Sequence, residues 1–183
     1  MASSERIVRL TGRLDKDQAA EVNQKLRTLA DLSQDIITLM IVDCPGGEAE
    51  EGLLLHDTIQ EITEKTPIIG VAQNMIASMA MVILQACTRR LIVAKTKVLV
   101  HPLIFEVQLP ITKVSSVSLL KHFRRVVGWQ KKIDQIFSER SGLPIKQVIE
   151  LLGRAVQGQE TDAIMSPSEA KGAGLVDEII DSL

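Results

Sequence analysis

The sequence predicts an α/β protein, and two patterns support this prediction. Short apolar runs rich in β-branched residues, such as 36–42 (IITLMIV) and 68–72 (IIGVA), have the composition of strands buried on both faces of a parallel sheet. Segments with apolar residues at helical spacing lie between these runs. The two kinds of segment alternate over 183 residues with short breaks and no repeat or linker, so we expect a single α/β domain.

The N-terminal elements are predicted from where apolar runs begin and end. Residues 7–10 (IVRL) have the pattern of a short strand that Gly12 closes. Asp17 is the expected N-cap of a helix that continues to residue 32. The strand at 36–42 ends at Pro45-Gly46-Gly47, because proline and glycine interrupt regular structure.

The central elements follow at similar spacing. Helical periodicity returns at 53–62 and stops at Pro67, after which the strand at 68–72 begins. Residues 78–88 are almost wholly apolar, which is typical of a helix buried on all sides. Two further β-type runs surround a polar turn, at 91–94 and 98–100.

The C-terminal half is dominated by one long helical pattern. Residues 115–141 are basic and amphipathic, with their apolar side chains on one broad stripe, and 145–152 is a second helical segment. The sequence Ser-Pro-Ser-Glu at Ser166 predicts an N-cap followed by a short helix. That helix is expected to end at Gly174, before a last strand at 176–180.

Composition narrows the class of protein. Hydrophobic residues make up 45%, charged residues 24% and the net charge is -2, so no electrostatic case arises for binding nucleic acid or an anionic membrane. Cys44 and Cys87 are too few for a disulfide framework, and no Cys/His spacing suggests a metal or another cofactor. No secretory signal or membrane span is present, so we expect the cytoplasm, with the chloroplast stroma or another organelle matrix as the alternative.

Three motifs could carry chemistry. Pro45-Gly46-Gly47 follows a buried strand, Ala77-Ser78-Met79-Ala80 opens an apolar helix, and His101 ends a third apolar run. Alone, each has an ordinary explanation: a turn, an N-cap serine and a structural histidine. Together they supply a hydroxyl, a base and backbone amides from the ends of different strands, which is what a serine nucleophile needs. His56 and His122 lie in helical, charged surroundings, and we interpret them as structural.

At these motifs the chain resembles ClpP, the proteolytic subunit of the Clp protease, within the ClpP/crotonase superfamily. The resemblance runs from about residue 5 to residue 180. It rests on five ordered segments: 5–12, Pro45-Gly46-Gly47 with 52–53 and 57–60, 77–80, 98–101, and 165–170 together with 174–177.

The resemblance implies both a fold and a site. The fold would consist of repeated ββα units with a protruding handle helix, so that a head of about 1–110 and 142–183 carries a handle region of about 111–141. Ser78 would be the nucleophile and His101 its general base, with the backbone N–H groups of Gly47 and Met79 as the oxyanion hole. Handles of the family interdigitate between two stacked heptameric rings, which implies a homo-oligomer that encloses peptide or unfolded protein substrates.

Several positions depart from the family pattern. The third member of the triad is not evident: Asp162 is the first candidate, and Glu160 and Glu150 are nearby carboxylates. Bulky residues follow His101 where the family has glycines, and Glu48 places a carboxylate next to the expected oxyanion hole. The absence of tyrosine removes the residues that usually line the docking pockets for an AAA+ unfoldase, which weighs against that partner.

Three functions therefore compete. The leading hypothesis is a ClpP-like serine endopeptidase that cleaves peptide bonds inside an oligomeric chamber. Its main rival is a catalytically weak or inactive, ClpR-type ring subunit that partners an active paralogue, which the missing acid and Glu48 favour. The third is an acyl-CoA enzyme of the crotonase type, which shares the fold but needs no Ser-His pair.

Overall fold

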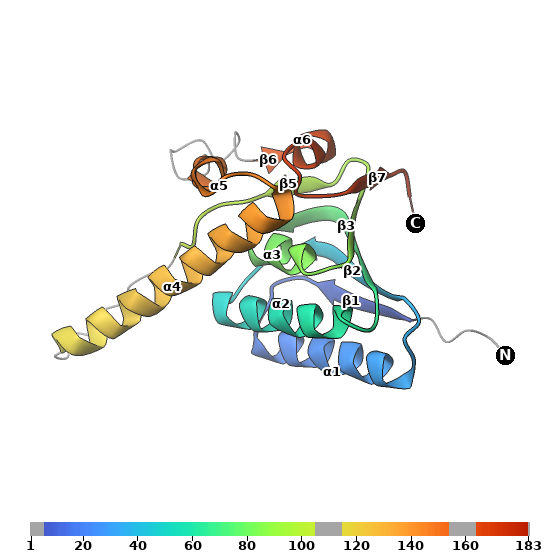
Figure 1. Ribbon diagram of the computed structural model, residues 1–183, viewed down its shortest axis with the longest axis horizontal. Coiled ribbons are helices and arrows are strands. Elements are labelled where there is room, and N and C mark those ends of the chain that lie inside the picture. The colour runs from blue at the N-terminus through green and yellow to red at the C-terminus, as the bar shows by residue number, and fades with distance from the viewer. Residues whose placement is uncertain (1–5, 105–114, 154–163, 183) are drawn as a thin grey trace.

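A parallel β-sheet forms the centre of the molecule in the computed structural model, which describes residues 6–104, 115–153 and 164–182 (Figure 1). The strands β1, β2, β3, β4 and β7 lie side by side in that order, and each neighbouring pair is parallel. The strand β5 continues the sheet beside the end of β3, and β6 pairs antiparallel with β5. The α/β class predicted from the sequence is thus confirmed. The bounds are Ile7–Thr11 (β1), Ile37–Cys44 (β2), Ile68–Ala77 (β3), Arg89–Val93 (β4), Lys97–Leu99 (β5), Ile164–Met165 (β6) and Glu178–Ile180 (β7).

Helices cover the sheet and extend beyond it. In Figure 1, α1, α2 and α3 lie along one side of the sheet, and α5 and α6 lie near its other end, beside β5 and β6. The centre of β2 is buried on both sides, as its continuous apolar run predicts. The helix bounds are Lys16–Leu32 (α1), Ala49–Thr63 (α2), Met79–Gln85 (α3), Ser116–Ser141 (α4), Ile145–Gly153 (α5) and Pro167–Gly172 (α6).

Element boundaries differ from the sequence prediction in a few places. Asp15, and not Asp17, caps α1, because its side chain accepts a hydrogen bond from the Gln18 N–H at 2.9 Å. The strand β3 continues to Ala77, five residues past the predicted end, because its last residues pair with β5. The short strand β6 was not predicted, since two residues carry no periodicity.

The helix α4 projects from the body of the molecule (Figure 1). It starts at the N-cap Ser115, whose hydroxyl accepts from the Ser118 N–H, and ends at Gly142 in the left-handed conformation. Its C-terminal half is buried against the core through Ile133, Ile136 and Phe137. Its N-terminal half exposes apolar side chains, which are Val117, Leu120, Phe123 and Val127.

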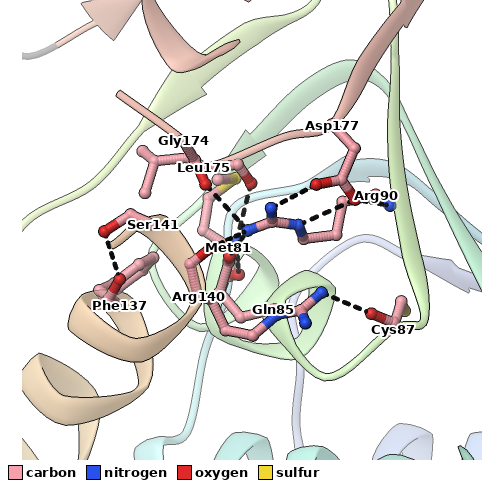
Figure 2. A network of polar contacts seen from close by, with 10 residues as sticks. All are labelled: Met81, Gln85, Cys87, Arg90, Phe137, Arg140, Ser141, Gly174, Leu175 and Asp177. Carbon is pink, nitrogen blue, oxygen red and sulfur yellow. Dashed lines mark hydrogen bonds and ion pairs between the residues drawn. The ribbon is translucent and has the colours of Figure 1, made fainter. Parts of the chain in front are cut away.

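A polar network holds the base of α4 against α3 (Figure 2). The buried guanidinium of Arg90 pairs with Asp177 and also donates to Gln85 Oε1 at 2.6 Å. It donates further to the carbonyl oxygens of Arg140 and Gly174. Strand β4, helix α3, the end of α4 and the segment before β7 therefore share one buried cation, which places α3 relative to α4.

Candidate active site

Ser78 lies on a sharp turn between β3 and α3. Its backbone angles are φ 53° and ψ -123°, which is unusual for a residue other than glycine. The Ser78 N–H donates to the Leu99 carbonyl at 2.9 Å and so ties the turn to β5. Strained strand-to-helix turns of this kind carry the nucleophilic serines of α/β-hydrolases.

The hydroxyl of Ser78 does not behave as an ordinary N-cap. Ser115 and Ser166 both accept a backbone N–H of their helices, whereas Ser78 occupies the N-cap position of α3 without a side-chain capping bond. The Ser78 side chain therefore does not form the N-cap hydrogen bond that would have explained this serine structurally. Its hydroxyl is left for another partner.

The Pro45-Gly46-Gly47 segment packs directly on the Ser78 turn. A Cβ on Gly46 would lie 2.8 Å from both the Ser78 Cβ and the Met79 nitrogen, so only glycine fits there. A Cβ on Gly47 would lie 1.9 Å from the Leu14 carbonyl oxygen. The two glycines thus allow the backbone to approach both the nucleophile turn and the segment after β1.

The expected oxyanion donors are Gly47 and Met79. Leu14 forms a parallel bridge to Gly47 by donating to the Gly46 carbonyl and accepting from the Glu48 N–H. In that pattern the N–H of Gly47 itself points away from Leu14. Met79 is the first residue of α3, so its N–H has no acceptor within the helix. Gly47 lines the same cavity as Ser78, and Met79 follows Ser78 directly, so both backbone donors are candidates to hold an oxyanion.

His101 follows β5 by two residues and is half-buried. Its Nδ1 lies 2.6 Å from the carbonyl oxygen of Pro102. Since a carbonyl oxygen only accepts, this contact requires the proton on Nδ1, and in the neutral ring Nε2 is then the acceptor. This tautomer is the one that a general base needs.

Ser78, His101, Gly47 and Glu48 line the same cavity, whose volume is about 340 Å³. The segment after β1, the start of α2, the loop after His101 and the face of α4 complete it. The other lining residues are Arg13, Ala49, Glu50, Leu103, Ile104, Val126 and Trp129. Sequence reasoning missed Arg13, Val126 and Trp129, because no local motif marks side chains that reach a site from distant elements.

The remaining sequence candidates lie elsewhere. Asp162 and Glu160 fall outside the described residues. Glu150, on α5, lines a separate cavity beside β6 and α6. His56 is buried in α2 beside Asp57, and burial lowers its pKa, in keeping with a structural role.

Glu48 and Arg13 bring opposite charges to the cavity. Glu48 precedes the first residue of α2 and belongs to the cavity wall, close in sequence to the expected oxyanion donor Gly47. A carboxylate there opposes the formation of a second negative charge, whereas the guanidinium of Arg13, which lines the same cavity, would favour it.

Neither a metal centre nor a membrane span is found in the described ranges. Within residues 6–104, 115–153 and 164–182, no group of three or more His, Cys, Asp or Glu side chains is arranged to hold a metal ion. In the same ranges, no helix combines the length and the apolar character that crossing a bilayer requires.

The fold and the cavity define a class of protein: an α/β domain with a candidate serine nucleophile at a strand-to-helix turn, beside glycine-rich backbone donors and a histidine. A sequence profile of the family described as Clp protease matches residues 1–183. The chain belongs to the Clp protease family, whose members are serine-type peptidases.

Named relatives agree with this membership. The chain is 31% identical to the ATP-dependent Clp protease proteolytic subunit 2 of Pseudomonas aeruginosa, over 97% of this chain and 82% of that protein. It is 29% identical to the proteolytic subunit 3 of Streptomyces avermitilis, over 96% of this chain and 74% of that protein. A solved structure of a ClpP1 mutant from Listeria monocytogenes superposes with a TM-score of 0.79 at 25% identity, covering 97% of this chain and 92% of that one.

Proposed function

We propose that this chain is a serine endopeptidase subunit that hydrolyses peptide bonds with Ser78 as nucleophile and His101 as general base. The observation that carries the proposal is the meeting of three separate segments at one cavity. The strained Ser78 turn, the closely packed Gly46-Gly47 backbone and the Nδ1-protonated His101 all contribute to it. A structural serine requires none of these features.

The chemistry follows from this arrangement. His101 Nε2 takes the hydroxyl proton as Ser78 Oγ attacks the peptide carbonyl carbon, and the negative oxygen is held by the N–H groups of Gly47 and Met79. The imidazolium then gives the proton to the leaving amine, and an acyl-enzyme remains. Water, deprotonated by His101, releases the acid and restores Ser78.

Reaction with a fluorophosphonate probe tests the proposal directly. Intact mass and peptide mapping should place one adduct on Ser78, with none in Ser78→Ala. His101→Gln should slow labelling by about 10²-fold or more, because the base is lost. Ser115→Ala, which removes an N-cap serine on α4, should leave the adduct unchanged. A wild-type protein that forms no adduct at Ser78 would refute the peptidase proposal.

A second candidate function is an inactive, ClpR-type ring subunit. The carboxylate of Glu48 in the cavity wall and the bulky Leu103 and Ile104 favour it, since both features hinder formation of the oxyanion or access to it. Glu48→Gln separates the two functions. The peptidase proposal predicts that labelling of Ser78 accelerates by about 3–10-fold, because a charge opposing the oxyanion is removed. An inactive subunit would stay unlabelled after the substitution.

The substrate class and the assembly belong to the same proposal. Short unfolded peptides are the expected substrates, because they can enter a chamber without an ATPase. The tests above therefore need no AAA+ unfoldase. A homo-oligomer of stacked rings would enclose the cavity. The exposed apolar side chains of α4 support this part of the proposal.

A further inference from the structure

The loop that carries His101 is connected to α4 by a chain of hydrogen bonds. His101 Nδ1–H donates to the Pro102 carbonyl at 2.6 Å, and the Leu103 N–H donates to Gln130 Oε1 at 2.7 Å. Gln130 Nε2 in turn donates to Asp134 Oδ1 at 2.7 Å. Four side chains or peptide groups therefore lie in a continuous series that ends on a carboxylate.

A single peptide unit joins the first two of these bonds. The carbonyl that accepts from His101 and the N–H held by Gln130 are opposite ends of the bond between Pro102 and Leu103. Because a peptide unit is planar and rigid, a side chain that holds its N–H also aims its carbonyl. Gln130 thus sets the direction of the acceptor that holds the His101 ring and its tautomer.

All donors in the series point the same way, from His101 toward Asp134. Hydrogen bonds arranged head to tail strengthen one another, because each bond polarises the next. The negative end lies at Asp134, and positive charge develops at His101 when it takes the proton from Ser78. The polarity of the chain therefore favours the imidazolium of the proposed reaction.

Asp134 is unusual for its position on α4. It is 9% exposed and lies between the buried Ile133 and Ile136, on the face that packs into the core. A buried carboxylate is costly unless it is hydrogen-bonded. Gln130 donates to it, one helical turn away, and the pair is half-buried as a whole.

We propose that Gln130 and Asp134 are positioning residues that orient His101 and favour its protonated form through the peptide between Pro102 and Leu103. The inference rests on the proposed function, since His101 matters only if it is the base. Gln130 and Asp134 would thus connect α4, which projects from the body, to His101.

The test uses substitutions that keep or break the series of hydrogen bonds. Gln130→Met keeps the shape but removes both bonds, and Gln130→Glu keeps the acceptor for Leu103 but sets two carboxylates together. Each should slow fluorophosphonate labelling of Ser78 by about 10-fold or more. In the double variant Gln130→Glu with Asp134→Asn, the amide at position 134 can donate to the carboxylate at position 130. The hydrogen bond between the two positions is thus restored with its direction reversed, and labelling should return to within about 3-fold of wild type.

Asp134→Asn alone tests the negative charge of Asp134 without changing the geometry of the series. The amide oxygen that this substitution introduces can still accept from Gln130, so the geometry is kept while the negative end is lost. The midpoint of the pH profile of labelling should therefore move to lower pH. Among the described residues, the other charged side chains on the cavity are Arg13, Glu48 and Glu50. These side chains are the same in every variant, so a difference in the midpoint between Asp134→Asn and wild type is due to the charge of Asp134.

Gln135→Met is the matched control, because Gln135 donates to Glu139 at 2.8 Å on the same helix but on its exposed side. It should leave rate and pH profile unchanged, and thermal unfolding should show all variants folded. The proposal is overturned if Gln130→Met and Asp134→Asn match wild type, or if the double variant labels no faster than Gln130→Glu.

A readout independent of activity separates this inference from the proposed function. The titration of His101, followed by NMR of ¹³C-histidine-labelled protein and assigned with His101→Gln, should shift to lower pH in Asp134→Asn. If wild type forms no adduct but this shift is seen, the peptidase proposal fails while the coupling to Asp134 stands. An unchanged titration would overturn the coupling.

Discussion

At the scale of single residues, the candidate site depends on backbone that has no space for side chains. Gly46 lies against Ser78 and Met79 so closely that a methyl group would overlap both. Ser78 itself holds a conformation that L-residues rarely adopt. Strain of this kind persists only where neighbouring structure enforces it. The close packing of Gly46 and the bond from the Ser78 N–H to Leu99 supply that enforcement.

Gly46→Ala should therefore displace the nucleophile. The added methyl group would lie 2.8 Å from three atoms at a position whose φ is +85°. We expect the Ser78 labelling rate to fall by about 10-fold or more and the free energy of unfolding to drop by about 1–3 kcal/mol. Labelling kinetics and denaturant unfolding measure the two effects.

Gly12→Ala is the control for that substitution. Gly12 has a similar φ of +72° but open space around its Cα, so Gly12→Ala carries the backbone strain without the clash. It should cost stability but leave labelling close to wild type. Equal labelling losses in the two variants would contradict the role given to close packing at Gly46.

At the scale of elements, the network around Arg90 braces the helix that Ser78 opens (Figure 2). The guanidinium reaches α3 through Gln85 and α4 through the Arg140 carbonyl. Partial burial raises the pKa of Asp177, but the hydrogen bonds and charge of Arg90 outweigh that effect, so its pKa lies below its ordinary value. The ion pair thus joins strands and helices that are far apart in sequence.

Asp177→Asn should destabilise the protein in a pH-dependent way. A carboxyl group whose pKa is lowered by folding contributes its full stability above its ordinary pKa and loses it as the pH falls through the folded value. We expect a loss of about 2–3 kcal/mol at pH 7, which is below the roughly 3–5 kcal/mol of fully buried pairs because Asp177 is partly exposed. The difference from wild type should shrink below about pH 4.

Glu178→Gln provides the comparison at the neighbouring position. It breaks the ion pair with Arg89, whose side chains are both well exposed, and should cost no more than about 0.5 kcal/mol. Urea unfolding at several pH values measures both variants. A pH-independent loss in Asp177→Asn would show that packing, and not the ion pair, is responsible.

At the scale of the whole molecule, α4 leaves the body with apolar side chains in solvent (Figure 1). Val117 is 73% exposed, Leu120 55% and Val127 51%. Apolar groups that gather on one projecting helix are typical of an interface, because isolated chains seldom leave such groups in water. The buried C-terminal half of α4 anchors this surface to the core.

We therefore expect the chain to assemble in solution. Sedimentation should give a mass well above the 20.1 kDa of one subunit, and about 280 kDa if two rings of seven form. Leu120→Glu should lower that mass, because a charge replaces an apolar contact. Leu32→Glu changes a leucine outside α4 that is even more exposed, at 73%, and should keep the assembly intact. A monomeric wild type would contradict the interface.

Much of the fold could be predicted because its signals are local. The run at 36–42 corresponds to β2, which spans Ile37–Cys44 and is buried at its centre, and the capping pattern at Ser166 forms as a capping box. The candidate pair of Ser78 and His101 could be named from ordered motifs, and the structure brings both to one cavity. Their roles, and that of Asp162 outside the described residues, stay predictions.

The sequence by itself determined the α/β class, the order of most elements and the segments that meet at the candidate site, because composition and periodicity act over a few neighbouring residues. Tertiary structure alone decided how these segments meet. The 2.8 Å approach of Gly46 to Ser78, the added walls from Arg13 and Trp129, and the path from His101 to Asp134 join residues far apart in the sequence only through packing. Such contacts arise when the whole sheet and α4 are assembled, and no local pattern encodes them.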